Sequence, residues 1–540
     1  MPIAALSSVL RAATVPHARP AAARDLRSWL RRAWAVGLLA LAGCAGLPPP
    51  VERPDTHALP AEGTALGRLV HEAAPDPERS GLRPLINGAE AFDALAALID
   101  RAERSLDLQY YLVRGDDSSC ALLQRVRGAA VERGVRVRLL VDDLNTAGEE
   151  ELLLALARVP GIEVRLYNPL PAGRFSTLTR VLASLTELPR VNRRMHNKML
   201  VADNAVAVTG GRNLGDAYFL RSPSSNFVDL DVLAAGPVVR SLSTAFDRYW
   251  NDPLAYPVQA LAGAPAAAAS GPSSLDAPVP DAVHGRLAGN AWTADLVAGR
   301  LPALEWAPVR LLVDPPSKIG DAAAGGNPAP GPEQTLADDL IGLVRTARSE
   351  VIVISPYFVP GPRGMAVVRE LHAHGVALRV LTNSLASTDA PAVHIGYSRY
   401  RAALLENGVE LHELRRQLGQ PQAGLGDYGS SNASLHSKAL VIDRRIAVIG
   451  SMNMDPRSAR LNTELGLVIR SDDIAEQLAA LYEDVSASSA WRVTLGADGE
   501  PSWETTQPEP RSHRGGEPDA AIWLQLALRL LAPFAPEEML

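Results

Sequence analysis

The chain contains little of what several protein classes require. Its 540 residues include two cysteines, Cys44 and Cys120, so the sequence predicts no disulfide framework. A formal net charge of −7 argues against a protein that tracks a nucleic-acid backbone, because such proteins carry a surplus of basic side chains. No H-x-x-E-H, C-x-x-C or acidic cluster suggests a metal site, and neither a metal nor a cofactor is expected.

Lysine is the scarcest of the charged residues. The 53 basic side chains include only three lysines, Lys198, Lys318 and Lys438. Two of the three lie in a pattern that occurs twice, H-x-K-x4-D-x6-G-x2-N, with a constant spacing of 240 residues between the copies. The repeated residues are His196 and His436, Lys198 and Lys438, Asp203 and Asp443, Gly210 and Gly450, and Asn213 and Asn453. This repeat indicates that the chain consists of two copies of one half.

Each copy of the motif has the pattern of a strand, a tight turn and a second strand, with the turns at Asp203-Asn204 and at Asp443. Because residues i and i+2 of a strand point to the same face, the His and Lys of each H-x-K emerge side by side. An imidazole beside an ammonium group suits attack on a phosphate, in which one group attacks or moves a proton and the other neutralises oxygens. Two buried hairpins with incidental His and Lys are the alternative, but they leave the selective use of Lys unexplained.

Alternating helical and strand patterns predict an α/β fold with two pseudo-symmetric halves, each a mixed, mainly parallel sheet flanked by helices. The expected divisions are a targeting segment at 1–44, a Pro-rich tether at 45–80, a first half at 81–300, a second half at 301–500 and a tail at 501–540. Within the first half, 255–300 is rich in Ala, Pro, Gly and Ser and is expected to hold little packed structure. The tail combines a polar linker with an apolar helix that either lies on a bilayer or packs against the body, and packing is the expectation.

The first 44 residues have the pattern of a secretory signal. Four arginines precede an apolar run, AWAVGLLALAG, that is too short for a comfortable membrane span. The run ends at Cys44 in a sequence, LAGC, that resembles the bacterial lipobox, in which the Cys is diacylated and becomes the new N-terminus. The sequence therefore predicts a membrane-anchored lipoprotein of the bacterial cell envelope that faces the periplasm, on the inner or the outer membrane. A simple N-terminal anchor helix is the alternative.

The paired motifs resemble those of the phospholipase D superfamily, whose two H-x-K-D halves form one active site. The resemblance implies that one motif His attacks phosphorus and forms a covalent phosphohistidine, while the other protonates the leaving alkoxide and then deprotonates the incoming alcohol. The symmetric motifs do not order the two histidines; His196 is taken as the nucleophile and His436 as the acid and base. The expected catalytic set is His196, Lys198, Asp203, His436, Lys438 and Asp443. Its two aspartates lie at the hairpin turns and are expected to brace the motif.

The same resemblance implies further site residues. Asn213, Asn453, Gly211 and Ser451 are expected to bind the substrate phosphate beside the lysines. Each reactive imidazole needs an acceptor for its second ring nitrogen. The superfamily's pattern pairs Glu464 with His196 and Asp229 with His436 across the halves, and Asp231 is an equally placed rival of Asp229. Five arginines before the first motif either line an anionic substrate's entrance or form a solvated loop. They are Arg174, Arg180, Arg190, Arg193 and Arg194.

Longer sequence segments indicate a narrower family within this superfamily. MHNKM, VTGGRNLGDAYF, FVDLDVLAAGP, SPYFVPG and SMNMDPRSARLNTELGL resemble the bacterial cardiolipin synthases of the C type, over nearly everything after Gly81. Most cardiolipin synthases have two N-terminal transmembrane helices, whereas this chain has a lipobox-like signal. The resemblance implies a membrane phosphatidyltransferase with phosphatidylglycerol as acceptor and phosphatidylethanolamine as donor.

Three other functions are open at this point. In a phospholipase D, water takes the second displacement and phosphatidic acid is released. A DNA or RNA phosphodiesterase is disfavoured by the acidic, two-motif chain with its lipid anchor, and no nucleic-acid partner is expected. A non-catalytic scaffold is the weakest alternative, because both motifs are intact.

Overall fold

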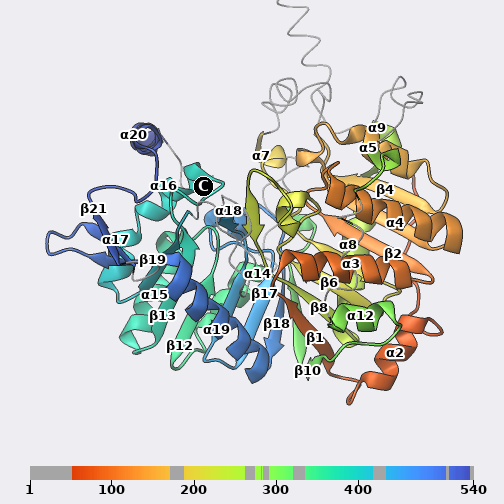
Figure 1. The fold of residues 1–540 in the computed structure, drawn as a ribbon, viewed down its shortest axis with the longest axis horizontal. Helices are drawn as coiled ribbons and strands as arrows, with labels where there is room; N and C mark the ends of the chain where they lie inside the picture. The colour runs from red at the N-terminus through yellow and green to blue at the C-terminus, as the bar shows by residue number, and fades with distance from the viewer. Residues whose placement is uncertain are drawn as a thin grey trace, which may run out of the picture.

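The computed structural model of the protein describes residues 51–170, 188–261, 274–280, 283, 291–319, 335–416, 433–505 and 510–534. These residues form two large mixed β-sheets with helices on their faces (Figure 1). A two-stranded sheet, made of one strand from each half, connects them. The predicted α/β fold with two similar halves is confirmed.

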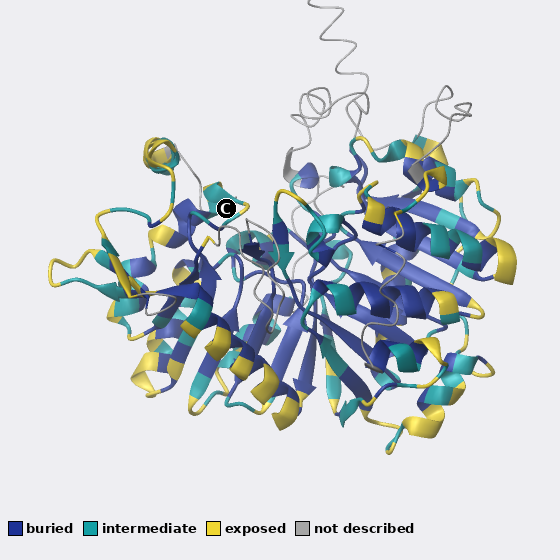
Figure 2. Cartoon of the chain, viewed as in Figure 1, coloured by how far each residue is buried: buried dark blue, intermediate teal, exposed yellow. Residues whose placement is uncertain are grey.

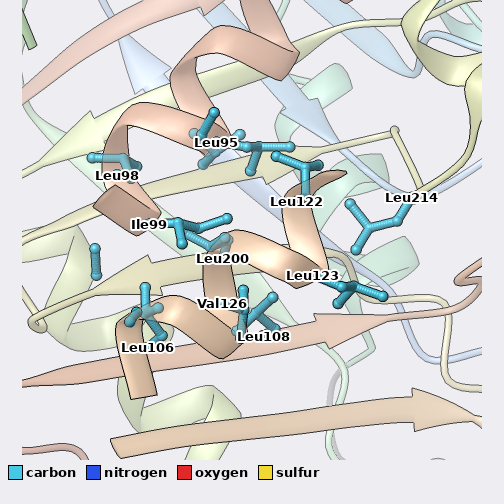
Figure 3. Close-up of a cluster of buried hydrophobic side chains, with 14 of the residues drawn as sticks. Leu95, Leu98, Ile99, Leu106, Leu108, Leu122, Leu123, Val126, Leu200 and Leu214 are labelled. Carbon is cyan, nitrogen blue, oxygen red and sulfur yellow. The ribbon is translucent and has the colours of Figure 1, made fainter. Parts of the chain in front are cut away.

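The first sheet has nine strands in the order β10-β1-β8-β6-β5-β2-β3-β4-β9. They span Glu305–Ala307 (β10), Ser80–Leu85 (β1), Asp231–Ala235 (β8), Val206–Gly210 (β6), Met199–Ala202 (β5), Ser105–Tyr110 (β2), Arg136–Asp142 (β3), Ile162–Tyr167 (β4) and Ala255–Pro257 (β9). On one face, α3 (Gly88–Arg101) and α4 (Asp117–Arg133) cover a hydrophobic cluster that includes Leu98, Leu123 and Leu200 (Figure 3).

Helix boundaries follow from residues that the sequence already contains. Asn87 begins α3, and its side chain accepts the backbone N–H of Glu90 at 2.8 Å. Asp116 caps α4 in the same way. Gly134 ends α4 with a φ of 69°, a left-handed conformation that a glycine adopts without steric cost. The side chain at each start pairs one of the N–H groups that a helix leaves without a partner.

The second sheet repeats this plan with ten strands in the order β11-β18-β17-β16-β12-β13-β14-β19-β20-β21. They span Val309–Val313 (β11), Leu465–Arg470 (β18), Ile446–Gly450 (β17), Ala439–Ile442 (β16), Glu350–Ile354 (β12), Ala377–Asn383 (β13), Glu410–Leu414 (β14), Ala490–Leu495 (β19), Pro501–Thr505 (β20) and Arg511–Arg514 (β21). On one face, α14 (Leu336–Val344), α15 (Gly361–Ala373) and α17 (Arg401–Glu406) cover a further hydrophobic cluster.

Two long helices contribute to a core that the halves share, α8 (Pro237–Trp250) from the first half and α19 (Asp472–Ser489) from the second. One continuous hydrophobic cluster contains Val201 of β5, Leu242 of α8, Ile449 of β17 and Leu478 of α19. The strands β5 and β17 are almost entirely buried, whereas α8 and α19 are each buried on one side and exposed on the other (Figure 2). Because the two halves share this core, their relative position is fixed by packing and not by a hinge.

The prediction that each sheet is mainly parallel is wrong. Within the large sheets only β2-β3-β4 and β12-β13-β14 run parallel, and all other neighbours are antiparallel. The parallel strands come from helical crossovers, which return the next strand in the same direction. The two motif hairpins lie in the middle of the sheets and reverse the chain, so they impose antiparallel neighbours.

The predicted tether is part of the folded body from residue 51 onward. Trp250 donates its indole N–H to the Thr56 hydroxyl at 2.8 Å, and the Asp247 carboxylate accepts the N–H of Ala58 at 2.9 Å. Further along, α2 (Ala65–Ala73) buries Leu66 against the first half. The residues before 51, including Cys44 and its signal, lie outside the described residues.

Two more segments pack where composition suggests loose structure. In the predicted unpacked segment 255–300, β9 extends the first sheet, and Trp292 and Leu296 of α12 (Ala291–Val297) are buried in the hydrophobic cluster of that half, where α12 contacts α3. The polar linker of the tail contains β21, which extends the second sheet. The chain stays in the first sheet through β10, so the change of sheet comes shortly after the boundary predicted at 300/301. Buried apolar side chains hold the first of these segments, whereas β21 is held by its backbone pairing with β20.

The apolar helix of the tail does not pack as expected. α20 spans Ile522–Leu531, and none of its residues is buried. Among the helices that the structure describes, none has both the length and the apolar character needed to cross a bilayer.

Replacing Leu200 by alanine is expected to destabilise the protein by about 2–5 kcal/mol, because Leu200 is 1% exposed in the cluster of Figure 3 and the substitution leaves a cavity. The free energy of unfolding, measured by denaturant titration, checks this. Val131→Ala is the matched control, because Val131 is 62% exposed and its truncation should change the free energy by less than about 0.5 kcal/mol. Equal losses in the two variants would contradict the assignment of the core.

Candidate active site

Each motif folds as the predicted hairpin. β5 and β6 are joined through Asp203 and Asn204, both with a φ of 52°, and β16 and β17 through Asp443 and Arg444, with φ of 51° and 52°. Two successive residues of positive φ form the tight turn that matches the twist of antiparallel strands. Asp and Asn tolerate this conformation, whereas Arg is rare there. Ion pairs hold the Arg444 side chain to Glu350, Glu476 and Glu483.

The motif aspartates tie each hairpin to the strand beside it. The Asp203 carboxylate accepts three backbone N–H groups at the start of β2, and Asp443 does the same at the start of β12. The donors are Glu103, Arg104 and Ser105 for Asp203, and Arg348, Ser349 and Glu350 for Asp443. Since these contacts lie at the turn, at the opposite end of the strand from the His, both aspartates have the contacts of a bracing residue.

The backbone of each motif histidine is held by the other half. The N–H of His196 donates to the Thr463 carbonyl at 2.9 Å, and the N–H of His436 donates to the Val228 carbonyl at 2.7 Å. Around these bonds, β15 (Ala433–Leu435) pairs in parallel with β7 (Asn226–Val228), and Met195 forms a parallel bridge with Thr463. The two H-x-K segments therefore enter the interface side by side with a segment of the opposite copy.

The residue after each of these carbonyls is the carboxylate that reaches the imidazole. The Nδ1 of His196 lies 3.0 and 2.9 Å from the two oxygens of Glu464, and the Nδ1 of His436 lies 2.5 Å from Asp229 Oδ2. The structure thus contains both crossed pairs that the sequence predicts. Asp231, the rival of Asp229, instead pairs with Arg212 at 3.2 Å in β8.

Ser451 and Gly211, which were expected at the phosphate, lie behind the carboxylates. The Ser451 hydroxyl is completely buried and donates to Glu464 Oε2 at 2.5 Å. At Gly211, an added Cβ would lie 2.1 Å from Asp229 Oδ1, so the shorter carboxylate occupies the space of a side chain. The serine of one copy and the glycine of the other therefore differ for a physical reason. Glu464 leaves room for the Ser451 side chain, which holds it by a hydrogen bond, whereas Asp229 occupies the space that a side chain at Gly211 would need.

Both imidazoles are buried, and their ionisation is shifted accordingly. Burial lowers the pKa of His196 to about 4, against the opposing effect of Glu464. Burial also lowers the pKa of His436, with Lys438 adding to the effect and Asp229 opposing it. For Glu464 and Asp229, burial is the largest effect and raises the pKa, but the neighbouring histidine, the motif lysine and further polar partners together outweigh it, so both pKa values are lowered. A charged carboxylate at Nδ1 keeps the proton on that nitrogen and leaves the Nε2 lone pair available for attack.

The two motif lysines are buried beside the histidines. Lys198 Nζ donates to the His196 carbonyl at 2.6 Å, and Lys438 Nζ donates to the His436 carbonyl. Burial lowers the pKa of Lys198 to about 7, and the charge of Lys438 lowers it further, against Glu464. Burial also lowers the pKa of Lys438. Two buried ammonium groups that repel each other form a site in which a bound anion is favourable.

The two motif asparagines differ in their contacts. Asn213 accepts the N–H of Leu112 at 3.2 Å and donates from Nδ2 to the Tyr218 hydroxyl at 2.9 Å, which leaves its second Nδ2 proton for another acceptor. The Oδ1 of Asn453 is buried and has no hydrogen-bond partner among the described residues. At least one end of each amide is thus available to a substrate.

Several residues of the site were missed by the sequence analysis. Tyr111 meets the ring of His196 edge-on at 4.9 Å, and the rings of Tyr218 and Phe227 lie 5.4 and 5.0 Å from His436. The one signal for Tyr111 in the sequence is that the aromatic segments QYY (109–111) and PYF (356–358) lie at or just after the ends of equivalent strands, β2 and β12, of the two halves. These rings cover the imidazole faces and restrict access of water.

The residue before each histidine is fixed by a polar side chain at the end of a neighbouring strand. Asp142 at the end of β3 accepts the N–H of Met195 at 2.9 Å. Asn383 at the end of β13 accepts the N–H of Leu435 at 2.9 Å and donates to its carbonyl at 2.9 Å. Equivalent positions of the two halves thus hold the H-x-K segments in place.

The three arginines before the first motif that the structure describes neither line an entrance nor form a solvated loop. Arg190 is buried and donates to Asn168 Oδ1 at 2.6 Å, and Arg194 is buried and pairs with Asp142 at 3.3 Å. Arg193 donates to the Lys318 carbonyl at 2.6 Å. These guanidinium groups satisfy carbonyls and carboxylates of the scaffold. Arg174 and Arg180 lie outside the described residues.

Comparison with known proteins gives consistent relatives. The family model described as "Cardiolipin synthase, PLD-like domain" matches residues 95–250 and 340–485, one match in each half. The chain is 38% identical over 476 residues to cardiolipin synthase C of Escherichia coli, covering 86% of this chain and 97% of that one. It is 26% identical over 410 residues to a cardiolipin synthase of Geobacillus kaustophilus, covering 75% and 66%.

A solved structure shares the fold. The phosphatidylserine synthase of Haemophilus influenzae superposes with a TM-score of 0.53 at 14% identity, covering 88% of this chain and 99% of that chain. At this identity the likeness concerns the two-sheet fold alone.

The asymmetry behind the carboxylates predicts unequal effects of two mirrored substitutions. Ser451→Gly removes one hydrogen bond to a charged group and should lower the free energy of unfolding by about 1.5–3 kcal/mol. Gly211→Ser should lower it more, because the new side chain collides with Asp229 and displaces it from His436. Thermal or denaturant unfolding of both variants measures the difference. A neutral effect of Gly211→Ser would show that the space beside Asp229 is open.

The ionisation of His196 predicts how stability depends on pH. With its pKa lowered to about 4, the folded protein binds fewer protons than the unfolded chain between pH ~6.5 and ~4, so stability falls as the pH is lowered through this window. His196→Asn removes this titration but keeps a donor toward Glu464. The free energy of unfolding of the native protein, relative to the variant, should decrease by about 3 kcal/mol from pH 7 to pH 4. Denaturant titrations at four pH values measure this, and parallel pH profiles would contradict it.

Proposed function

The chain belongs to the phospholipase D superfamily, as a cardiolipin synthase-like member, and from this premise we propose that it is a phosphatidyltransferase that makes cardiolipin. In this reaction phosphatidylglycerol is the acceptor alcohol and phosphatidylethanolamine is the phosphatidyl donor. The name of the Escherichia coli relative, cardiolipin synthase C, supports the product.

The observation that carries the proposal is the pair of crossed contacts, His196 with Glu464 and His436 with Asp229. Each gives a buried, neutral imidazole with a defined tautomer. Two such groups beside two buried lysines provide a nucleophile, a proton donor and charge neutralisation in one place. Transfer of a phosphodiester uses all three.

The reaction proceeds as two displacements. His196 Nε2 attacks the donor phosphorus, the bond to the ethanolamine oxygen breaks, and His436 gives that oxygen a proton. His436 then takes the proton from a hydroxyl of phosphatidylglycerol, whose oxygen attacks phosphorus as the bond to His196 breaks. Glu464 fixes His196 for this role with both oxygens and is itself held by Ser451.

The remaining motif residues neutralise the negative charge of the phosphate or hold the hairpins in place. Lys198, Lys438 and the amides of Asn213 and Asn453 bind the nonbridging phosphate oxygens. The negative charge of the bound phosphodiester raises the pKa of both lysines and of His436, so the substrate itself brings these groups into their charged, working forms. Asp203 and Asp443 support the reaction only by holding the hairpins.

We also propose that the protein is attached to a membrane of the bacterial cell envelope through a diacylated Cys44. The lipobox-like sequence before Cys44 supports this attachment. Metabolic labelling with a fatty acid should label the protein, and Cys44→Ala should abolish the label. Labelling that survives this substitution would rule the attachment out.

The first test supplies purified protein with phosphatidylglycerol and phosphatidylethanolamine labelled in its ethanolamine. We expect cardiolipin and released ethanolamine, and a loss of at least about 100-fold in His196→Ala, since the nucleophile is removed. Phosphatidic acid in place of cardiolipin would make the protein a phospholipase D. Absence of lipid turnover with any donor would redirect the search to nucleic-acid phosphodiesters.

A second test orders the two histidines. A phosphodiester with a good leaving group, such as p-nitrophenolate, needs no proton donor in the first displacement. With this substrate His436→Ala should still release about one equivalent of nitrophenolate per protein in a burst and retain the phosphoryl group on the chain. His196→Ala should do neither. The reverse pattern would make His436 the nucleophile.

A further inference from the structure

The helix α20 presents an unpartnered apolar face to solvent (Figure 2). In the part of the chain that the structure describes, seven large hydrophobic side chains are exposed, and five of them lie on this one helix. They are 54% to 76% exposed and comprise Ile522, Trp523, Leu526, Leu530 and Leu531. Their spacing of four and eight residues aligns them along one side. Such a concentration marks a contact surface and not scattered surface leucines.

Polar groups attach the helix to the body beside the half-buried Leu524 and Leu528, and the five exposed side chains take no part in this attachment. The Gln525 side chain donates to the carbonyls of Glu517 and Ala520 at 3.1 and 3.0 Å and accepts the N–H of Glu517. At the other end, Arg399 donates to the Ala532 carbonyl at 2.5 Å. Between the helix and the second half lies a cavity of about 780 Å³, lined in part by Gln525 and Arg529. The fold thus holds α20 away from its own core and orients the apolar side outward.

The charges on α20 itself are compatible with a phospholipid surface. The helix contains no acidic residue, and its one charged side chain is the exposed Arg529. The cavity beside the helix is lined by both signs of charge, with Arg514 on one hand and Asp498, Glu500 and Glu517 on the other. Arg399 holds the C-terminal end of the helix. A short helix with Trp and Leu on one side and arginines at its margin is typical of segments that lie in the headgroup region of a bilayer.

The position of α20 relative to the candidate active site points the same way. α7 (Leu188–Val191) ends shortly before His196, and α18 (Pro456–Arg460) begins shortly after Asn453. In Figure 1, α7, α18, α16 (Pro391–Ser398) and α20 all lie toward the upper edge of the molecule. A surface that contacts α20 at this edge is therefore on the same side as α7 and α18, the helices that adjoin the two motifs in the sequence.

We propose that α20 is an interfacial helix that inserts its apolar face into a phospholipid surface and keeps the active site against the lipids on which it acts. This inference rests on the proposed function for the identity of the surface. The occupant of the apolar face is a bilayer containing anionic phospholipid. A second copy of the chain is the competing occupant, and the experiment separates the two.

The test compares the native sequence with one triple and one double variant. Trp523→Ser/Leu526→Ser/Leu530→Ser removes the apolar face of α20. Val131→Ser/Val297→Ser is the matched control, because it removes the two exposed large hydrophobic residues that lie elsewhere. All three proteins start at Ala45, so that neither the apolar run before Cys44 nor an acyl chain on Cys44 contributes to binding. Each protein is sedimented with vesicles of phosphatidylethanolamine and phosphatidylglycerol, and its turnover is measured on these vesicles and on soluble short-chain versions of the same lipids.

We expect the α20 variant to lose about tenfold or more in vesicle binding and in turnover on vesicles, since interfacial binding scales with buried apolar area. Its turnover on soluble lipids should equal that of the native protein, and the control should be unchanged throughout. Equal vesicle binding by the variant and the control would overturn the proposal. A parallel loss on soluble lipids would also overturn it, because α20 would then act on the fold or the site.

Light scattering distinguishes the competing occupant. A native mass of two or more chains that falls to one in the α20 variant would make the apolar face a self-association surface and overturn the proposal. Failure of the proposed function has a different signature. In that case the native protein turns over neither lipid form, while its vesicle binding still depends on α20.

Discussion

The structure depends on a crossed interaction: each motif histidine takes its carboxylate and its backbone hydrogen-bond partner from the other half. Neither half alone contains both a motif histidine and the carboxylate that binds it. A carboxylate and an imidazole removed from water are favourable only when their geometry is held closely, because desolvation opposes burial of the charge. The shared core of α8 and α19 supplies that constraint by locking the two sheets together. Packing far from the imidazoles is thus a condition for their chemistry.

The same reasoning explains why the site retains lysine in a chain that otherwise uses arginine. Lys198 and Lys438 are both buried, and burial lowers the pKa of each. A guanidinium at these positions would remain charged at any physiological pH, whereas an ammonium can lose its proton when the site is empty. Lysine therefore lets the fold tolerate two close cationic positions without an anion between them. The stability of the empty protein and its affinity for a phosphodiester are set by the same two groups.

Much of the fold and of the site could be predicted from the sequence, because the informative signals are local or repeated. The hairpins follow from alternating hydrophobic residues and turn residues at Asp203 and Asp443. The crossed carboxylates followed from the family resemblance together with their positions after each motif. The cover by Tyr218 and Phe227 and the clamps by Asp142 and Asn383 were not predicted, since these side chains approach only after the chain folds.

Other differences come from what a pattern cannot specify. The polar strand β21 lies at the edge of a sheet, where pairing needs no buried side chain and so leaves no alternation to read. The sequence of α20 predicts an apolar face but not what covers it, and the expected packing against the body was wrong. Ser451 was assigned to the phosphate because it follows a motif glycine, yet its hydroxyl serves Glu464. In each case the sequence pattern does not show which residues lie next to the segment in the folded protein.

The inequality between Gly211 and Ser451 has a consequence for how the two copies can change over time. Each carboxylate, the small residue behind it and the histidine it serves form a set whose members come from different halves of the chain. A longer acid in place of Asp229, or a serine in place of Gly211, is compatible with the site only when the other members are adjusted with it. The halves therefore cannot drift apart independently or be exchanged singly between relatives. A chimaera in which one half comes from a relative contains two sets of mixed origin. Both sets are complete again only when the carboxylate, the small residue and the histidine of each set come from the same protein.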